Sequence, residues 1–246
     1  MIREERSIMG MPVVVLLGEG GTVADAEAVF AWLHEVDERF STYKPSSEIS
    51  RINAGELVPA DYSDHMREIL EMCEAARISS GGYFNIWNGT IKDPSGLVKG
   101  WAIERAGELL QQRGVENFLV DVGGDMVVRG QVEGRPWVVG VRHPIQREFH
   151  VKRLELRDAG IATSGTYERG NHIYDPVTNQ VPKGLHSFTV VGPSIMMADL
   201  LATIGFAMGP EQGLAYVDRQ PGYSAFCITE DMQGLSTPSF AQYNKA

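Results

Sequence analysis

The stretch from residue 117 to residue 165 does most to narrow the folds open to this chain, because it contains five strand-like segments in succession. The segments cover residues 117–122, 125–130, 136–142, 151–157 and 160–165. The turns between the first four are too short for the crossover that a parallel pair of strands needs, so we expect antiparallel neighbours. Further strands are expected at residues 11–17, 185–191 and 223–228.

Amphipathic segments between these strands predict helices. In the first helix, from Thr22 as N-cap to about Arg39, apolar residues recur at the spacing of one buried face. Other helices are expected at residues 63–78, 98–113, 198–209 and 210–219. Antiparallel runs of strands with helices between the runs favour the α+β class over alternating β–α–β units. We predict a single compact, two-lobed domain of antiparallel sheets flanked by helices over residues 1–246, with a loose C-terminal tail at residues 232–246.

Composition and charge exclude several classes of protein. The chain has 246 residues, of which 22 are basic and 32 acidic, a net charge of -10 without any basic cluster. This balance argues against non-specific binding of nucleic acid. No apolar run approaches the length of a membrane span. The charged N-terminus lacks the apolar segment of a secretory leader, so a cytoplasmic location is expected.

Two glycine-rich stretches have the form of phosphate-binding backbone. In Asp93-Pro-Ser-Gly-Leu-Val-Lys-Gly100 a turn runs into a helix, Gly96 and Gly100 permit a close backbone approach, and Lys99 enters with the first helical turn. Amide groups at a helix start with a lysine beside them suit a phosphate. In Leu119-Val-Asp-Val-Gly-Gly-Asp125 an apolar strand runs into a tight turn, which we expect to leave backbone donors bare. Either stretch alone is a weak signal, because most such turns are only turns.

Asp199 and Thr203 are the clearest anomaly in the chain. They lie four residues apart on an otherwise apolar helix, so they share one face. A carboxylate inside an apolar helix is costly unless it is paired or binds a cation, and a carboxylate with a hydroxyl suits magnesium. The alternative is structural: an aspartate near the helix N-terminus and a threonine bonded to its own helix. The residues alone leave these two interpretations equally weighted.

His172 is a candidate general base. It precedes Asp175-Pro176 and follows the small hydroxyl residues of Thr163-Ser-Gly165. A lone histidine is more often structural than catalytic, and no further histidine or aspartate stands where a serine nucleophile at Ser164 would need it. The hydroxyl-rich stretch from Phe40 to Asn53, anchored by Ile49 and Ile52, is more typical of a loop that lines a site than of a solvated loop.

These motifs together resemble the ApbE family, the FAD:protein FMN transferases. The resemblance covers nearly the whole chain, in the family's order. It is carried by Met9-Gly10, Phe40-Ser-Thr-Tyr43, Ser47-Glu-Ile-Ser-Arg-Ile-Asn53, Ser95-Gly-Leu-Val-Lys-Gly100, Val122-Gly-Gly-Asp125, Ala162-Thr-Ser-Gly165, His172-Ile-Tyr-Asp-Pro176 and Ala198-Asp-Leu-Leu-Ala-Thr203.

The resemblance implies that FMN moves from FAD to a Ser/Thr hydroxyl of a target flavoprotein, with Mg²⁺ present and AMP released. It implies metal ligands at Asp199 and Thr203, with a main-chain oxygen near Gly96 as a third. It also implies that His172 activates the acceptor and that Lys99 faces the cofactor beside the reacting group. The remaining residues that the resemblance assigns to FAD are Ser41, Tyr43, Asn53, Gly123, Gly124, Asp125, Thr163, Ser164 and Gly165.

The chain departs from the family pattern at two positions, and two rival functions stay open. Asn85-Ile86 follows Phe84 where the family commonly has Asp-Pro, a change that can shift the choice of acceptor. Asn179 replaces a glycine, and asparagine tolerates the same left-handed turn. The rivals are an FAD pyrophosphatase that releases FMN and AMP, and a non-catalytic FAD-binding protein. The sequence names neither the target flavoprotein nor the oligomeric state.

Overall fold

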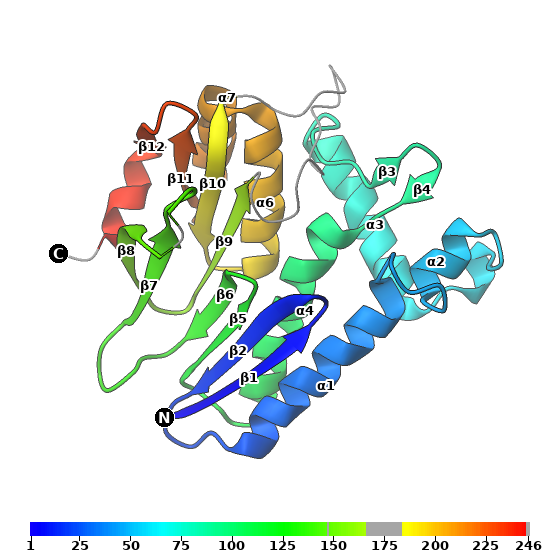
Figure 1. Cartoon of the computed structure of the whole chain (residues 1–246), viewed down its shortest axis with the longest axis horizontal. Helices are drawn as coiled ribbons and strands as arrows, with labels where there is room; N and C mark the ends of the chain where they lie inside the picture. The colour runs from blue at the N-terminus through cyan, green and yellow to red at the C-terminus, as the bar shows by residue number, and fades with distance from the viewer. Residues whose placement is uncertain (147, 166–183, 245–246) are drawn as a thin grey trace.

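An eight-stranded antiparallel sheet forms the centre of the molecule (Figure 1). The structure is a computed structural model, and it describes residues 1–146, 148–165 and 184–244. The strands lie in the order β1-β2-β5-β6-β9-β10-β11-β12, and each neighbouring pair is antiparallel. Their bounds are β1 (Ile2–Ile8), β2 (Met11–Leu17), β5 (Phe118–Val122), β6 (Asp125–Arg129), β9 (Ala159–Gly165), β10 (Leu185–Gly192), β11 (Ser224–Thr229) and β12 (Gly234–Ser236).

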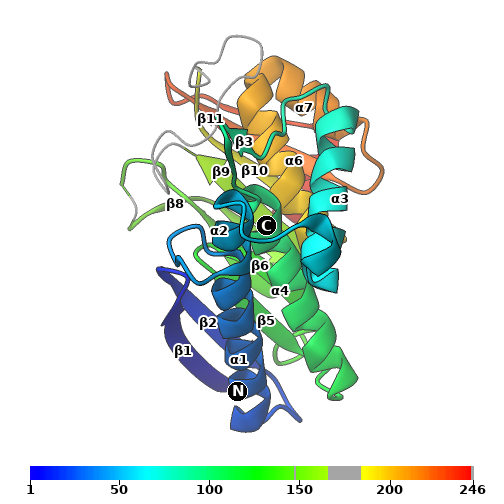
Figure 2. The same cartoon turned by 90° about the vertical axis from the view of Figure 1, so that its right-hand side faces the viewer.

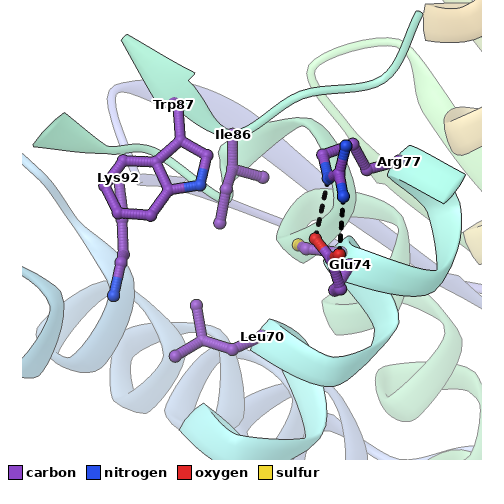
Figure 3. A pocket seen from close by; sticks show the side chains of 7 residues that line it. Leu70, Glu74, Arg77, Ile86, Trp87 and Lys92 are labelled. Carbon is purple, nitrogen blue, oxygen red and sulfur yellow. Dashed lines mark hydrogen bonds and ion pairs between the residues drawn. The ribbon is translucent and has the colours of Figure 1, made fainter. Parts of the chain in front are cut away.

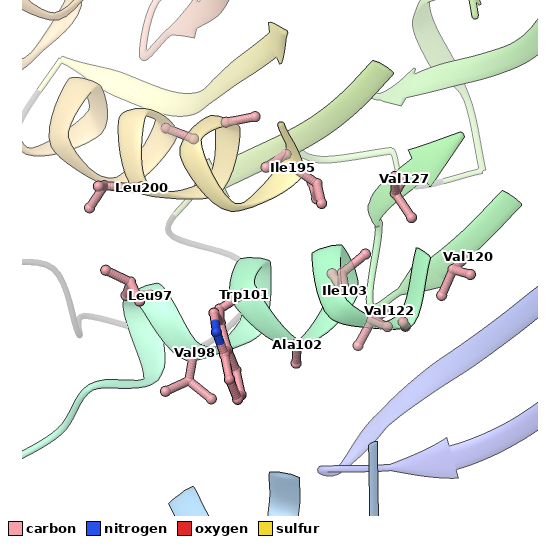
Figure 4. Packing of buried hydrophobic residues seen from close by; sticks show 14 of the residues in the cluster. Leu97, Val98, Trp101, Ala102, Ile103, Val120, Val122, Val127, Ile195 and Leu200 are labelled. Carbon is pink, nitrogen blue, oxygen red and sulfur yellow. The ribbon is translucent and has the colours of Figure 1, made fainter. Parts of the chain in front are cut away.

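Helices cover one face of this sheet and build the larger hydrophobic core (Figure 2). They are α1 (Val23–Phe40), α4 (Ser95–Gln112), α6 (Ile195–Met208) and α7 (Pro210–Asp218). Helix α4 lies beside α6 and packs on β5 and β6, where Ile103 lies close to Val127 and Ile195 (Figure 4). Trp101 points to the other side of α4, where its ring packs with Trp32 and Phe40. The burial of these apolar faces is the main stabilising contribution to the fold.

Smaller elements lie beyond the N-terminal end of α4. They are α2 (Glu48–Asn53), the 3₁₀ turn η1 (Pro59–Asp61), α3 (Asp64–Ser79), and the short hairpin of β3 (Trp87–Asn88) and β4 (Ile91–Lys92). The hairpin leads straight into α4, because only residues 93 and 94 separate Lys92 from Ser95. The position of this hairpin therefore fixes where α4 begins.

The opposite face of the sheet carries a second core. Strands β7 (Trp137–Arg142) and β8 (His150–Leu156) pair with each other and not with the large sheet. With the 3₁₀ helix η2 (Pro238–Tyr243) they cover Leu119, Ile161 and Phe226. The prediction of an α+β domain with antiparallel sheets and flanking helices is confirmed.

One strand was not predicted, and two local predictions differ from the structure. Residues 2–8 form β1, which pairs with β2 despite its many charges because its outer edge meets solvent. Segments 125–130 and 136–142 are not paired neighbours, because the chain crosses to the other face of the sheet between them. The predicted loose tail is wrong over residues 234–243: β12 pairs with β11, and Phe240 stacks on Phe226.

Across the described residues, no helix combines the length and the apolar content needed to cross a membrane.

Candidate functional site

The candidate site lies where α4, α6 and the ends of β6 and β9 meet. Gly100 makes this meeting possible, because a Cβ at that position would lie 2.8 Å from the Cβ of Asp199 and 2.9 Å from the Cα of Met196. Without that side chain, the amide of Gly100 donates to Oδ2 of Asp199 over 2.9 Å. The expected close approach at Gly100 is confirmed, and the group that approaches is helix α6.

A buried ion group of one lysine and two aspartates forms the centre of the site. Lys99 Nζ pairs with Oδ2 of Asp125 and lies 3.8 Å from Oδ1 of Asp199. The side chains are only 12%, 0% and 4% exposed, respectively. Water screens the interactions between such buried groups little, so the lysine and the two carboxylates interact strongly with one another. Lys99 lies in the second turn of α4, because that helix begins three residues earlier than predicted.

Hydroxyl groups from β9 and α6 continue the site beside this ion group. Ser164 Oγ and Thr203 Oγ1 lie 3.3 Å apart. On the neighbouring strand, Oδ1 of Asp125 accepts a hydrogen bond from the amide of Thr163 over 2.9 Å. Strand β9 therefore contributes a backbone amide and a side-chain hydroxyl, and its last residue, Gly165, closes the strand next to them.

The turn at Gly123 and Gly124 differs from the prediction in one respect. Both residues have positive φ, +64° and +102°, which glycine adopts without strain. The prediction of bare backbone donors is wrong: the amide of Gly123 donates to the carbonyl of Pro12 over 2.9 Å, and that of Gly124 to Oδ1 of Asp121 over 2.7 Å. These bonds fix the turn, and the absence of a Cβ at Gly123 leaves room for Met11, whose Sδ would lie 2.9 Å from it.

Asp121 adds a further acidic group beside the turn. Burial raises the pKa of its carboxyl, and the Gly124 amide and the Arg142 guanidinium oppose that rise. On β5, Asp121 alternates with Val120 and Val122, which face the helices, so its side chain belongs to the opposite face. The turn thus has an acidic residue on each face of the sheet, Asp121 on one and Asp125 on the other.

The hydroxyl-rich stretch folds back on itself through its own polar groups. The carbonyl of Ser41 accepts from the hydroxyls of Ser47 and Ser50, at 2.7 and 3.4 Å. Asn53 holds β4, because its amide group donates to the carbonyl of Lys92 and accepts from the amide of the same residue, both over 2.9 Å. Tyr43 is 94% exposed. The structure does not bring these three residues into contact with the ion group.

Two predicted site residues need separate mention. His172 lies outside the described residues, so its role as a base stays a prediction. Gly96 lies in the first turn of α4, and a Cβ there would come within 3.3 Å of Cε2 of Phe84 and 4.0 Å of Cγ2 of Thr203. Gly96 and Thr203 are therefore neighbours across the α4–α6 contact.

The oxygen groups at this contact fit a hard cation. Asp199 offers a carboxylate and Thr203 a hydroxyl, one turn apart on α6. In a regular helix the amide of Gly100 would donate to the carbonyl of Gly96. Here the same amide donates to Oδ2 of Asp199. Within the described part of the chain, no three residues of the types His, Cys, Asp and Glu gather to hold a metal. A donor set of few oxygens matches Mg²⁺, which keeps waters and substrate phosphates as its other ligands.

The sequence did not indicate two of the contacts at this candidate site. It did not foresee that Phe84 packs on Gly96, or that the acids of β6 and α6 share one lysine. The available signal was the pair Gly96 and Gly100 on one face of a helix, since two such glycines are typical of a close helix–helix contact. The partner helix could have been inferred from the buried acid at Asp199.

Comparisons with known proteins identify the family and the fold. The sequence model of the ApbE family matches residues 9–93 and 88–227. A FAD:protein FMN transferase of Klebsiella pneumoniae (strain 342) is 34% identical, over 59% of this chain and 44% of that protein. One of Haemophilus influenzae is 25% identical, over 94% of this chain and 87% of that protein. The apo crystal structure of the Pseudomonas stutzeri flavinyl transferase ApbE has a TM-score of 0.83 and 26% identity, and covers 100% of this chain and 97% of that one.

The extent of these matches differs between relatives. The matched part spans about half the length of the Klebsiella relative and of a Vibrio cholerae relative, 44% and 52% respectively.

Proposed function

This chain belongs to the ApbE family, and from that membership we propose that it is an FAD:protein FMN transferase. The single observation that carries the proposal to particular residues is the buried group of Lys99, Asp125 and Asp199, with Thr203 beside it. Splitting a pyrophosphate needs positioning and neutralisation of charge more than covalent chemistry, and a pre-arranged polar centre supplies both.

The proposed reaction transfers one phosphoryl group that carries the flavin. The hydroxyl oxygen of a Ser or Thr in the target protein attacks the phosphorus of the FMN half of FAD. The bond from that phosphorus to the bridging oxygen breaks, and AMP leaves with the bridging oxygen. The hydroxyl proton passes to a base, for which His172 is the candidate.

Asp199, Thr203 and the main-chain oxygen of Gly96 are proposed to hold Mg²⁺. The support is their all-oxygen chemistry and the short distances across the α4–α6 contact. A bound Mg²⁺ would neutralise charge on the pyrophosphate. Lys99 pairs with Asp125 and lies 3.8 Å from Asp199 in a site with little exposed surface, so it is placed to neutralise negative charge beside the proposed metal.

The flavin and phosphates are proposed to lie against the glycine turn and the end of β9. At Gly123 the missing side chain makes room for Met11, whose Sδ would lie 2.9 Å from a Cβ there. The turn at Gly123 and Gly124 is therefore proposed to meet the ligand through its backbone. Thr163, Ser164 and Gly165 are proposed to face the phosphates, beside Asp125 and Thr203. Ser41, Tyr43 and Asn53 are proposed to line the flavin end, where the exposed ring of Tyr43 is available to cover a bound ring.

Intact-mass spectrometry of a target protein tests this function. The full chain is incubated with FAD, Mg²⁺ and a flavoprotein domain that bears a Ser/Thr flavinylation motif, and the domain is weighed. We expect a gain of one FMN minus water, abolished by chelating the metal and by Asp199→Asn. The exposed Asp218 on α7 offers the matched control Asp218→Asn, which should keep the gain. Free FMN with an unmodified domain would instead identify a pyrophosphatase.

A further inference from the structure

A pocket of about 170 Å³ opens between α3 and the β3–β4 hairpin, away from the ion group (Figure 3). Leu70, Cys73, Glu74 and Arg77 line it from α3, and Ile86, Trp87 and Lys92 from the hairpin. A cavity of about 150 Å³ accommodates a group the size of benzene, so this one has room for one large apolar side chain. Burial raises the pKa of Cys73 to about 12, so its thiol is neutral and acts as part of an apolar wall.

The charges at the pocket leave one cation without an acidic partner. Arg77 donates twice to Glu74, over 2.8 and 2.7 Å, so these two charges cancel. Lys92 packs its ammonium over the ring of Trp87, 5.0 Å from the centroid, and no carboxylate of the described residues pairs with it. An occupant with an apolar side chain and a carboxylate nearby would therefore match the pocket in both shape and charge.

The pocket shares its hairpin segment with the candidate metal site. Phe84, two residues before Ile86, lies against Gly96. The side chain of Asn53 bonds both the carbonyl and the amide of Lys92, and so fixes its backbone. Lys92 is three residues from the start of α4. Trp87 is half exposed, so the rim presents an aromatic face to solvent. A protein segment seated here would lie beside the elements that hold the reacting groups.

From these observations we propose that this pocket docks the target flavoprotein, by taking an apolar side chain of the target while Lys92 pairs with a neighbouring carboxylate. This inference rests on the proposed function for the identity of its partner.

Two pairs of variants test the docking. Leu70→Trp fills the pocket, and Ile78→Trp is its control at an exposed position on the same helix. Lys92→Glu reverses the free charge. Lys152→Glu is its control on β8, because Lys152 also packs over an aromatic ring, Phe226, at 5.1 Å. The probe is a flavoprotein domain whose acceptor Ser or Thr is replaced by Ala, so that binding is measured with FAD and Mg²⁺ present but without transfer.

We expect Leu70→Trp and Lys92→Glu to raise the Kd for this probe about tenfold, while both controls stay within about twofold of the parent. The affinity for FAD, titrated separately, should stay unchanged in all four variants. The docking proposal is overturned if the parent does not bind the probe, if the pocket variants bind it as the parent does, or if all four variants weaken alike. It is also overturned if the pocket variants lose FAD together with the probe.

The transfer assay with the unaltered domain separates the two proposals. Loss of probe binding in the pocket variants, without any flavin attached by the parent chain, would support docking and contradict the proposed transferase. Normal flavin attachment with pocket variants that keep the parent KM for the domain would contradict docking and leave the transferase standing.

Discussion

At the scale of single residues, the molecule depends on a lysine buried between two acids. Lys99 reaches Asp125 and Asp199 from α4, and none of the three side chains is more than slightly exposed. Removing the lysine takes its positive charge away from two buried carboxylates, which costs more than the loss of an exposed pair.

Lys99→Met should therefore lower the free energy of unfolding by about 3–5 kcal/mol, measured by urea denaturation at pH 7. Lys44→Met is the control, because Lys44 also pairs with two acids, Asp37 and Glu38, but lies at the surface. It should cost at most about 1 kcal/mol. Equal losses in the two variants would show that the buried group is not held together by its charges.

Asp121 predicts a pH dependence of stability. Burial raises the pKa of its carboxyl above the ordinary value of 3.8, so the folded state binds a proton more tightly than the unfolded state does. Asp121 therefore lowers the free energy of unfolding at high pH. This unfavourable contribution is absent below pH 3.8, grows as the pH rises from 3.8 through the raised pKa, and then stays constant.

Asp121→Asn removes this charge and keeps an oxygen to accept from Gly124. The variant should be more stable than the parent at pH 7, and the difference should vanish as the pH falls below about 3.8, the ordinary value for an aspartate. Thermal melts from pH 3 to pH 8 measure it. If the variant were more stable than the parent by the same amount at every pH, the titration of Asp121 would be ruled out as the cause.

At the scale of elements, the contact between α4 and α6 positions the site. Gly100→Ala would drive a methyl group into the Cα of Met196 and the Cβ of Asp199. We expect a cost of about 1–3 kcal/mol in unfolding free energy, with loss of transfer activity, because backbone must move. Gly107→Ala on the same helix would meet only side-chain carbons of Val127 and Phe118, the nearest at 3.3 Å, and should cost less and keep activity. If both variants behave alike, close packing at Gly100 is unimportant.

The C-terminal segment closes the second core and is predicted to matter for stability. Phe240 is 1% exposed and stacks on Phe226 with ring centroids 5.6 Å apart. Phe240→Ala should cost about 3–5 kcal/mol in a denaturant titration. Phe149→Ala, at a ring that is 57% exposed, should change stability by less than about 0.5 kcal/mol. A negligible effect of Phe240→Ala would mean that the segment is as loose as its sequence suggested.

At the scale of the whole molecule, the sequence predicted most helices and strands, because each has a clear apolar period. It could not predict the β1 edge, whose charges hide the alternation, or that β7 and β8 leave the main sheet. The candidate site residues were selected by their chemistry, an acid in an apolar helix and glycines next to a lysine, and their roles stay predictions. The sequence could not predict which of these side chains lie close together. The pairing of Lys99 with Asp125 and Asp199 depends on how three separate elements pack.

The most direct test of the account compares AMP released with FMN attached in one reaction. The parent chain, FAD, Mg²⁺ and the unaltered target domain are mixed, AMP is measured by chromatography, and the domain is weighed at each time point. If the chain transfers FMN from FAD to a hydroxyl of the target, we expect one AMP for each flavin attached. Both products should be lost in Asp199→Asn. AMP that accumulates without a matching gain in the mass of the domain would contradict it.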